Sequence, residues 1–258
     1  MTFYKIYYQN GERAYLQKNY QEALDYFIKQ MDIEATTSCL NYIGCCYLGL
    51  EEYLLAIQTF NEVIAAKPNW EQPVVNLGRV YLKMQQFQKA FMYLDQGLNM
   101  NVQNPDSLFY MGVYFLSSHD YENAIKYFSQ SIEEDEQQSE PHLNLGLCYF
   151  RKSLYSLAIQ EFERSYQIEP SADAIRNKGL VLLELQKYSE ALEELDRAIQ
   201  LRPMDIECMV DMMYCHCKLQ QYDIALKMAN EALSLDPNHA TVKKFYEQIN
   251  IDLGLCNG

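Results

Sequence analysis

The chain has 258 residues, and its 21 lysines and arginines are outnumbered by 35 aspartates and glutamates, so the formal net charge is −14. This excess of carboxylates disfavours nucleic acids and anionic membrane surfaces as partners, because both are held mainly by lysine and arginine. Hydrophobic residues make up 49% of the chain, while glycine and proline number only 10 and 7. The composition therefore predicts an ordered protein of long helices rather than a β-sandwich or barrel.

The first residues of the chain, 1–10, lack both the basic start and the continuous apolar stretch of a secretory signal. No segment approaches the ~20 consecutive apolar residues that are needed to span a bilayer. We therefore expect a cytoplasmic protein that has no membrane partner.

A pattern of small and aromatic residues recurs along the chain at steps of 33 or 34 residues. A glycine stands in the first stretch of six of the seven copies. In all seven, an alanine lies twelve residues after that place, and an aromatic ring stands three residues before the alanine. The glycine places are Gly11, Gly44, Gly78, Gly112, Gly146 and Gly179, with Met213 in the seventh. Each copy holds two apolar-periodic stretches separated by a short turn, and the small residues let two helices approach closely.

In chain order, the copies predict seven helix-turn-helix repeats over about residues 4–36, 37–70, 71–104, 105–138, 139–171, 172–205 and 206–239. After the last repeat, residues 240–258 are predicted to form a capping helix and tail, with an apolar stripe of Val242, Phe245, Tyr246, Ile249 and Leu253. No such cap precedes the first repeat, so we expect Tyr4 and Tyr8 at an exposed edge. This edge is a candidate contact between copies of the chain, which would then form a homo-oligomer.

The pattern resembles that of the tetratricopeptide repeat family, which reads W-x2-L-G-x2-Y, then A-x3-F, then P over about 34 residues. The second copy matches it with Gly44, Tyr47, Ala56, Phe60 and Pro68. The family's tryptophan is replaced in every copy, by Tyr7, Leu40, Val74, Leu108, His142, Ile175 and Met209. The resemblance implies an all-α, right-handed superhelical solenoid of seven repeats over residues 1–239, followed by the capping helix.

One cluster, Cys208 with Cys215, His216 and Cys217, has residue types that bind metals. On a helix, however, Cys215 and Cys217 point to nearly opposite sides and cannot close one tetrahedral zinc site. The sequence has no Gly-rich phosphate loop, zinc-protease helix or nucleophile elbow. We therefore expect no enzyme activity, no cofactor and no metal.

In the family that the chain resembles, the first helix of each repeat lines a concave groove. Register from the glycine places puts Asn76, Asn144 and Asn177 at one inner position. An asparagine side chain both donates and accepts, so such a row can hold the backbone of an extended peptide. The other expected contacts are Arg79, Arg151 and Arg176 for an acidic group, and Tyr42, Phe109, Tyr110 and Leu143 for apolar groups.

These features favour a non-catalytic scaffold that binds an extended peptide or a partner protein in the groove. A chaperone-binding role is disfavoured, because Tyr8 and Glu12 stand where such family members carry Lys and Asn, and Asn76 replaces their Arg. Two alternatives stay open: a self-assembling module joined through its terminal edges, and a module that senses a short signalling peptide.

Overall fold

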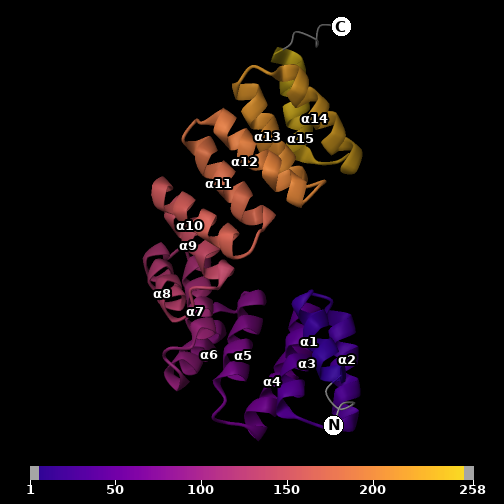
Figure 1. Ribbon diagram of the computed structural model, residues 1–258, viewed down its shortest axis with the longest axis vertical. Helices are drawn as coiled ribbons and strands as arrows, with labels where there is room; N and C mark the ends of the chain where they lie inside the picture. Colours follow the sequence, from indigo (N-terminus) through magenta and orange to yellow (C-terminus); the bar gives the residue numbers. More distant parts are fainter. Residues whose placement is uncertain (1–5, 253–258) are drawn as a thin grey trace. The chain divides into compact units, whose positions relative to one another are not determined.

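The computed structural model describes residues 6–252, and every regular element within that range is an α-helix (Figure 1). The helices in chain order are α1 (Ile6–Leu16), α2 (Tyr20–Ile33), α3 (Thr37–Gly49), α4 (Tyr53–Ala66), α5 (Glu71–Lys83), α6 (Phe87–Met100), α7 (Pro105–Ser117), α8 (Tyr121–Glu134), α9 (Ser139–Arg151), α10 (Tyr155–Ile168), α11 (Ala172–Glu184), α12 (Tyr188–Leu201), α13 (Ile206–Lys218), α14 (Tyr222–Leu235) and α15 (Ala240–Asp252). This all-α solenoid of helix pairs with a capping helix is the fold class that the sequence predicts. Tyr4 of the predicted exposed edge and Leu253 of the predicted capping stripe lie outside the described residues.

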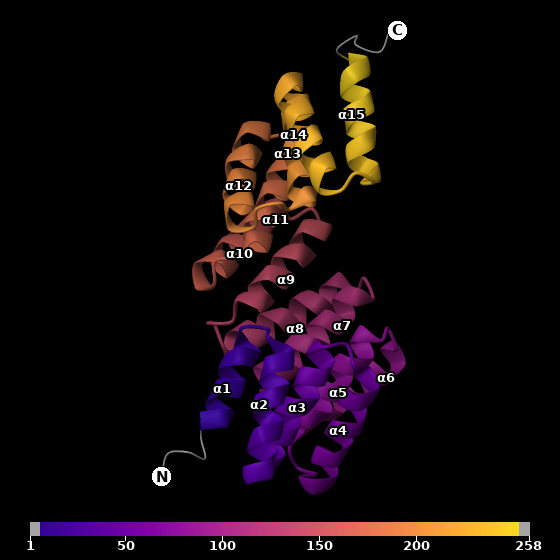
Figure 2. The same cartoon turned by 90° about the vertical axis from the view of Figure 1, so that its right-hand side faces the viewer.

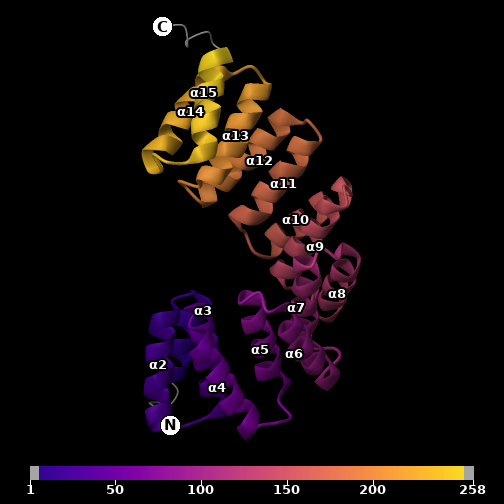
Figure 3. The ribbon, with the colours of Figure 1, turned by 180° about the vertical axis from the view of Figure 1, so that it is seen from behind.

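The chain divides into two compact units, residues 1–136 and residues 137–258, called unit 1 and unit 2 below. Unit 1 holds the pairs from α1 to α8. Unit 2 holds the pairs from α9 to α14, together with α15, and Figure 3 shows these helices following one another in chain order.

Close approach within six of the seven described pairs depends on the repeated glycine. A Cβ atom at Gly44 would lie 2.6 Å from Cε1 of Phe60, and one at Gly146 would lie 2.7 Å from Cε1 of Phe162. Each ring is buried and presses against the bare backbone of the partner helix. The glycine and the ring sixteen residues later are therefore one packing unit, in which the missing side chain makes room for the large one.

The turn between the helices of each pair is built from non-glycine residues in the left-handed backbone region. Their φ values lie between 57° and 63°, and the residues are Lys18, Glu51, Gln85, His119, Ser153, Gln186 and Gln220. Around Gln186, the amide of Lys187 donates to Leu182 O at 2.9 Å and the amide of Gln186 donates to Leu183 O at 2.9 Å. These paired bonds satisfy the last carbonyls of α11 and end the helix.

Helix starts are fixed by side-chain caps at several first helices. Thr36 accepts from the amide of Cys39 at 3.2 Å, and Asn104 accepts from the amide of Ser107 at 2.9 Å. Such caps satisfy amides that have no partner inside the helix.

Helix α15 covers the apolar end of the seventh repeat and lies alongside α14 in Figure 2. Its Val242 is fully buried and packs in one cluster with Met213, Ala229 and Ala232. Across the described residues, no helix joins the length and the apolar character that crossing a membrane requires.

Candidate functional site

The first helices of the repeats form the inner layer of each unit. In unit 1, α3 contacts α5 and α5 contacts α7, and in unit 2, α9 contacts α11 and α11 contacts α13. Among the described residues, the second helices of successive repeats make no comparable contact. Because the first helices lie closer together, each unit curves toward them, and the predicted groove residues are carried by this inner layer.

Asn76 of α5 is fully buried in unit 1 and makes hydrogen bonds within the protein. Its Nδ2 donates to Oδ1 of Asn41 at 3.2 Å and lies 3.4 Å from Sγ of Cys45. Its Oδ1 accepts from Nη1 of Arg79 at 2.8 Å. As placed here, Asn76 orients Arg79 and offers no exposed surface to a ligand.

Arg79 is held on three sides by uncharged groups. Besides Asn76, its guanidinium is hydrogen-bonded to the hydroxyl of Tyr15, and its Cζ lies 4.5 Å from the ring centroid of Tyr110. Burial raises the pKa of Tyr15, so its hydroxyl stays protonated. Three first helices, α1, α5 and α7, thus meet at one side chain that is only partly exposed.

A cluster of tyrosines continues from Tyr15 toward the start of unit 1. The ring of Tyr42 stacks on Phe27 at 4.8 Å between centroids, and its hydroxyl donates to Oε1 of Glu12 at 3.1 Å. Tyr8 packs edge-on against both of these rings, and burial together with Glu12 raises its pKa to about 12. Tyr8 is therefore packed into this cluster as well as partly exposed.

Phe109 lies at the back of the inner layer, not on its surface. Its side chain is buried, with its ring 5.8 Å from that of Phe128 and 4.9 Å from that of Tyr110. Of this pair, only Tyr110 remains partly exposed.

In unit 2 the inner asparagines differ from Asn76 in their exposure. Asn144 of α9 is partly exposed, and its Nδ2 donates to the carbonyl of Glu140 one turn earlier at 2.9 Å. Asn177 of α11 is also partly exposed, and no hydrogen bond joins its side chain to another described residue. Leu143 stands partly exposed beside Asn144, whereas Arg151 is exposed at the end of α9.

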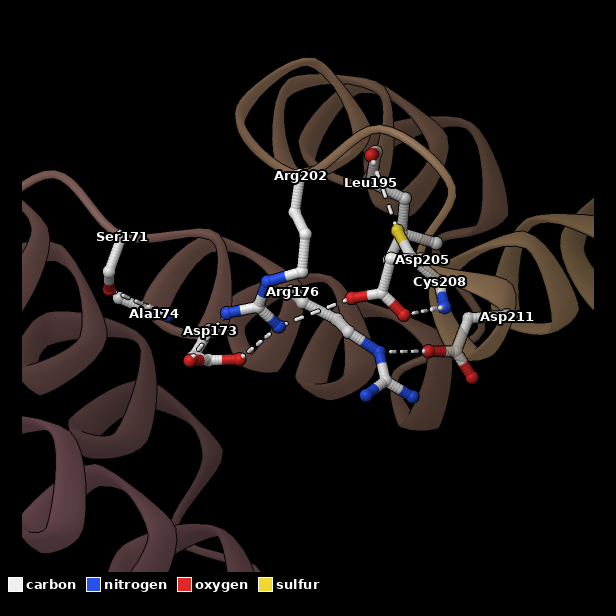
Figure 4. Close-up of polar contacts among 9 residues, drawn as sticks. All are labelled: Ser171, Asp173, Ala174, Arg176, Leu195, Arg202, Asp205, Cys208 and Asp211. Atoms are coloured by element: carbon white, nitrogen blue, oxygen red, sulfur yellow. Dashed lines mark hydrogen bonds and ion pairs between the residues drawn. The ribbon is translucent and has the colours of Figure 1, made fainter. Parts of the chain in front are cut away.

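Arg176 of α11 reaches across to Asp211 of α13. Its Nε donates to Oδ2 of Asp211 at 2.7 Å, while neither terminal nitrogen takes part in this bond (Figure 4). Burial raises the pKa of Asp211, although the neighbouring Arg176 opposes that shift. The pair leaves further N–H donors of Arg176 next to Asn177 on the inner layer.

Arg202, at the end of α12, makes a second charged contact with the first turn of α11 and with the residue that precedes α13. It holds both carboxylate oxygens of Asp173 at 2.9 Å and also contacts Asp205 at 3.3 Å (Figure 4). Asp205 in turn caps α13 by accepting from the amide of Cys208 at 3.1 Å. Because Arg202 and Asp173 are both half exposed, this ion pair contributes little to the stability of the fold.

The cysteine and histidine cluster of α13 is dispersed over different surroundings. Burial raises the pKa of Cys208 and of Cys215 to about 12, and Sγ of Cys208 lies 3.5 Å from the carbonyl of Leu195. His216 Nδ1 instead contacts Oε1 of Gln221 at 2.7 Å. Within residues 6–252 no three His, Cys, Asp or Glu side chains converge on a common metal position.

The architecture defined by these observations is a helical solenoid in which paired helices stack through an inner and an outer layer. Three family models described as tetratricopeptide repeat match residues 38–69, 75–139 and 182–249, which together cover more than half of the chain. The chain belongs to the tetratricopeptide repeat family. A further model, described as anaphase-promoting complex, cyclosome, subunit 3, matches residues 117–198.

Among curated proteins, the chain is 25% identical over 100 residues to heat shock protein STI1 of Saccharomyces cerevisiae. The match covers 38% of this chain and 17% of STI1, so the chain corresponds to a small part of that relative.

Many solved structures share the fold, and two of them illustrate the similarity. The Cut9–Hcn1 hetero-tetramer of the APC/C matches with a TM-score of 0.73 at 13% identity, over 93% of this chain and 54% of that one. The type IV pilus biogenesis factor PilW matches with a TM-score of 0.75 at 13% identity, over 81% of this chain and 97% of that one.

Proposed function

We propose that the chain is a non-catalytic scaffold that binds an extended segment of a partner protein along the inner layer of unit 2. The fold belongs to a class that supports protein-interaction scaffolds, and the proposal goes further by assigning the binding face to α9, α11 and α13. The observation that carries it is the contrast at one register position, where Asn76 is buried and bonded but Asn144 and Asn177 are partly exposed.

An extended peptide presents alternating amide donors and carbonyl acceptors along its backbone. The side-chain amide of Asn177 can donate to a carbonyl of the peptide, and the side-chain carbonyl oxygen of Asn144 can accept from an amide of the peptide. Both contacts involve only the peptide backbone, so they do not depend on the side chains of the ligand. The terminal nitrogens of Arg176 supply further donors to a ligand carbonyl or carboxylate.

Apolar groups on the same layer provide contact area for ligand side chains. Leu143, Leu147 and Leu180 are each partly exposed, and Tyr214 of α13 is 39% exposed. A ligand with apolar residues at intervals would bury this area, while the net charge of −14 favours basic flanking residues.

The test uses the full chain and a displayed library of random peptides. Selected peptides are synthesised, and their affinity is measured by calorimetry for the wild type, for Asn144→Ala with Asn177→Ala, and for the control Asn230→Ala. Asn230 is exposed on α14, a second helix, so its loss leaves the inner layer unchanged.

We expect the double variant to weaken binding at least tenfold, because each lost hydrogen bond is worth about 1 kcal/mol, and the control to bind like the wild type. Unchanged affinity in the double variant would remove these asparagines from the site. Light scattering on the same samples tests the self-assembly alternative, which predicts concentration-dependent association that Asn144→Ala and Asn177→Ala leave intact.

A further inference from the structure

The geometry points to a receptor for one carboxylate group on the inner layer of unit 1, with the guanidinium of Arg79 as its binding group. This inference goes beyond the peptide face of unit 2, since it lies on different helices and uses a charge instead of an asparagine row. It takes from the proposed function only that the ligand is a peptide.

Arg79 is an inner arginine without an acidic partner. Although carboxylates outnumber basic residues by 35 to 21, none of the ion pairs among the described residues includes Arg79. Arg176, on the inner layer of unit 2, has Asp211 at 2.7 Å. A partly buried guanidinium that lacks a counter-ion keeps a positive potential that an incoming anion can neutralise.

The guanidinium is also held in one orientation before any ligand arrives. Asn76 accepts one of its N–H groups at 2.8 Å, Tyr15 is bonded to it, and Tyr110 supports its face at 4.5 Å. Asn76 is itself fixed by Asn41 at 3.2 Å. Arg79 carries more N–H donors than Asn76 and Tyr15 accept, so the remaining donors form a preorganised fork.

The surroundings favour a carboxylate over a phosphate. All groups that hold Arg79 are uncharged, so the site offers a single positive charge, whereas a phosphate carries nearly two negative ones. The nearby tyrosine cluster contains Glu12, bonded to Tyr42 at 3.1 Å, which adds a negative charge on the same layer. A singly charged carboxylate flanked by apolar groups suits this combination of one cation and several aromatic rings.

The test is a titration of the full, isotope-labelled chain followed through the Nε–H signal of Arg79, assigned from its loss in Arg79→Lys. Three small probes are compared: acetyl-glutamate methylamide for a side-chain carboxylate, acetyl-alanine for a C-terminal carboxylate, and acetyl-glutamine methylamide as the neutral isostere. Inorganic phosphate is the fourth. The Nε–H of Arg176, already bonded to Asp211, is the internal reference.

We expect a saturable shift of the Arg79 signal with one or both carboxylates, at least tenfold tighter than with acetyl-glutamine methylamide and tighter than with phosphate. The probe that binds more tightly shows whether the carboxylate of the ligand is a side chain or a C-terminus. Equal shifts with the neutral isostere, tighter binding of phosphate, or an immobile Arg79 signal would overturn the inference.

Two variants separate this outcome from that of the peptide proposal. Asn144→Ala with Asn177→Ala leaves the Arg79 titration unchanged, because these residues lie in unit 2. Tyr110→Leu keeps the charge and removes the supporting ring, and should weaken carboxylate binding several-fold while circular dichroism reports an intact fold. If the double variant binds the selected peptide as tightly as the wild type does, while the Arg79 signal still responds to carboxylates, only the earlier proposal is refuted.

Discussion

In the seventh repeat, the large residue is on the first helix, as Met213, and the small residue is on the second helix, as Ala229, which is the reverse of the other repeats. Elsewhere a glycine of the first helix faces a large side chain sixteen residues later, as Gly146 faces Phe162. In the seventh repeat the first helix carries Met213 and the second carries Ala229, and both are fully buried in one cluster. The volume is conserved although both residues differ from the pattern.

This exchange predicts strong coupling between the two positions. Met213→Gly alone leaves a cavity and should cost about 2–5 kcal/mol of unfolding free energy, and Ala229→Phe alone overfills the cluster at about 1–3 kcal/mol. The double variant restores the glycine–phenylalanine pair, so we expect it to be more stable than the sum of the single effects by about 1–3 kcal/mol. Urea unfolding of the four proteins measures this term, and additive effects would contradict the exchange.

Cys148 gives the fold a pH dependence on the alkaline side. Burial raises its pKa from the usual 9.0 to about 12, so the folded chain holds this proton more tightly than the unfolded chain does. The contribution of Cys148 to stability is complete below pH 9 and is lost as the pH rises toward 12.

We therefore expect Cys148→Ala to flatten the fall of unfolding free energy with pH above 9, by up to about 1.4 kcal/mol per pH unit. The variant is compared with the wild type in urea at pH 7, where the thiol is protonated in both states, and at pH 9.5 and 10.5. Parallel curves for the two proteins would show that this thiol does not titrate with unfolding.

At the scale of the helices, each turn within a pair places a residue with a side chain in the left-handed region. The strain repeats in every turn within a pair, because the two backbone hydrogen bonds that end the first helix require this left-handed conformation. A left-handed backbone costs a residue with a Cβ about 1–2 kcal/mol, which glycine avoids. A glycine at these turn positions should therefore give a higher free energy of unfolding than the residue that is present.

Gln186→Gly should consequently raise the unfolding free energy by about 0.5–1 kcal/mol, after the greater flexibility of glycine in the unfolded chain is included. Gln186 is exposed with φ 59°. The matched control Gln160→Gly lies exposed within α10, where glycine costs about 1 kcal/mol. If both substitutions destabilise the chain, the turn residue is not strained.

At the scale of the whole chain, repeat positions that face the same neighbour in every copy were predictable from the sequence. The alanine and the aromatic residue of each copy, together with the glycine of the first six copies, set the helix pairs. The inner layer was less predictable, because Asn76, Asn144 and Asn177 share a register but not their neighbours. Only Asn76 meets Asn41 and Cys45 from the preceding repeat.

The contact of Tyr15 with Arg79 was not predicted from the sequence. Four residues after Gly11 on α1, its place in the repeat was visible, but its bond reaches α5 two repeats onward. The same holds for Asp211, whose register was clear while its pairing with Arg176 depends on the spacing of α11 and α13. Contacts between repeats require coordinates, since the period alone fixes contacts within a repeat.

Because each repeat contacts mainly its neighbours, damage at one end should remain local. Val242→Asp places a charge in the fully buried contact of α15 with the seventh repeat. We expect amide protection to fall across residues 206–252 and to persist in residues 6–134, measured by hydrogen exchange. The control Lys243→Asp lies exposed on the same helix, and loss of protection throughout the chain in Val242→Asp would contradict nearest-neighbour stability.

The central claim is that the inner layer of unit 2 binds the backbone of an extended peptide through Asn144 and Asn177. The most direct measurement compares a selected peptide with analogues methylated at single backbone nitrogens, against the wild type and the Asn144→Ala, Asn177→Ala variant. Methylation removes one donor and keeps every side chain. We predict that at least one methylation weakens binding to the wild type at least tenfold and has no further effect in the variant. Equal loss in both proteins would contradict backbone recognition by these asparagines.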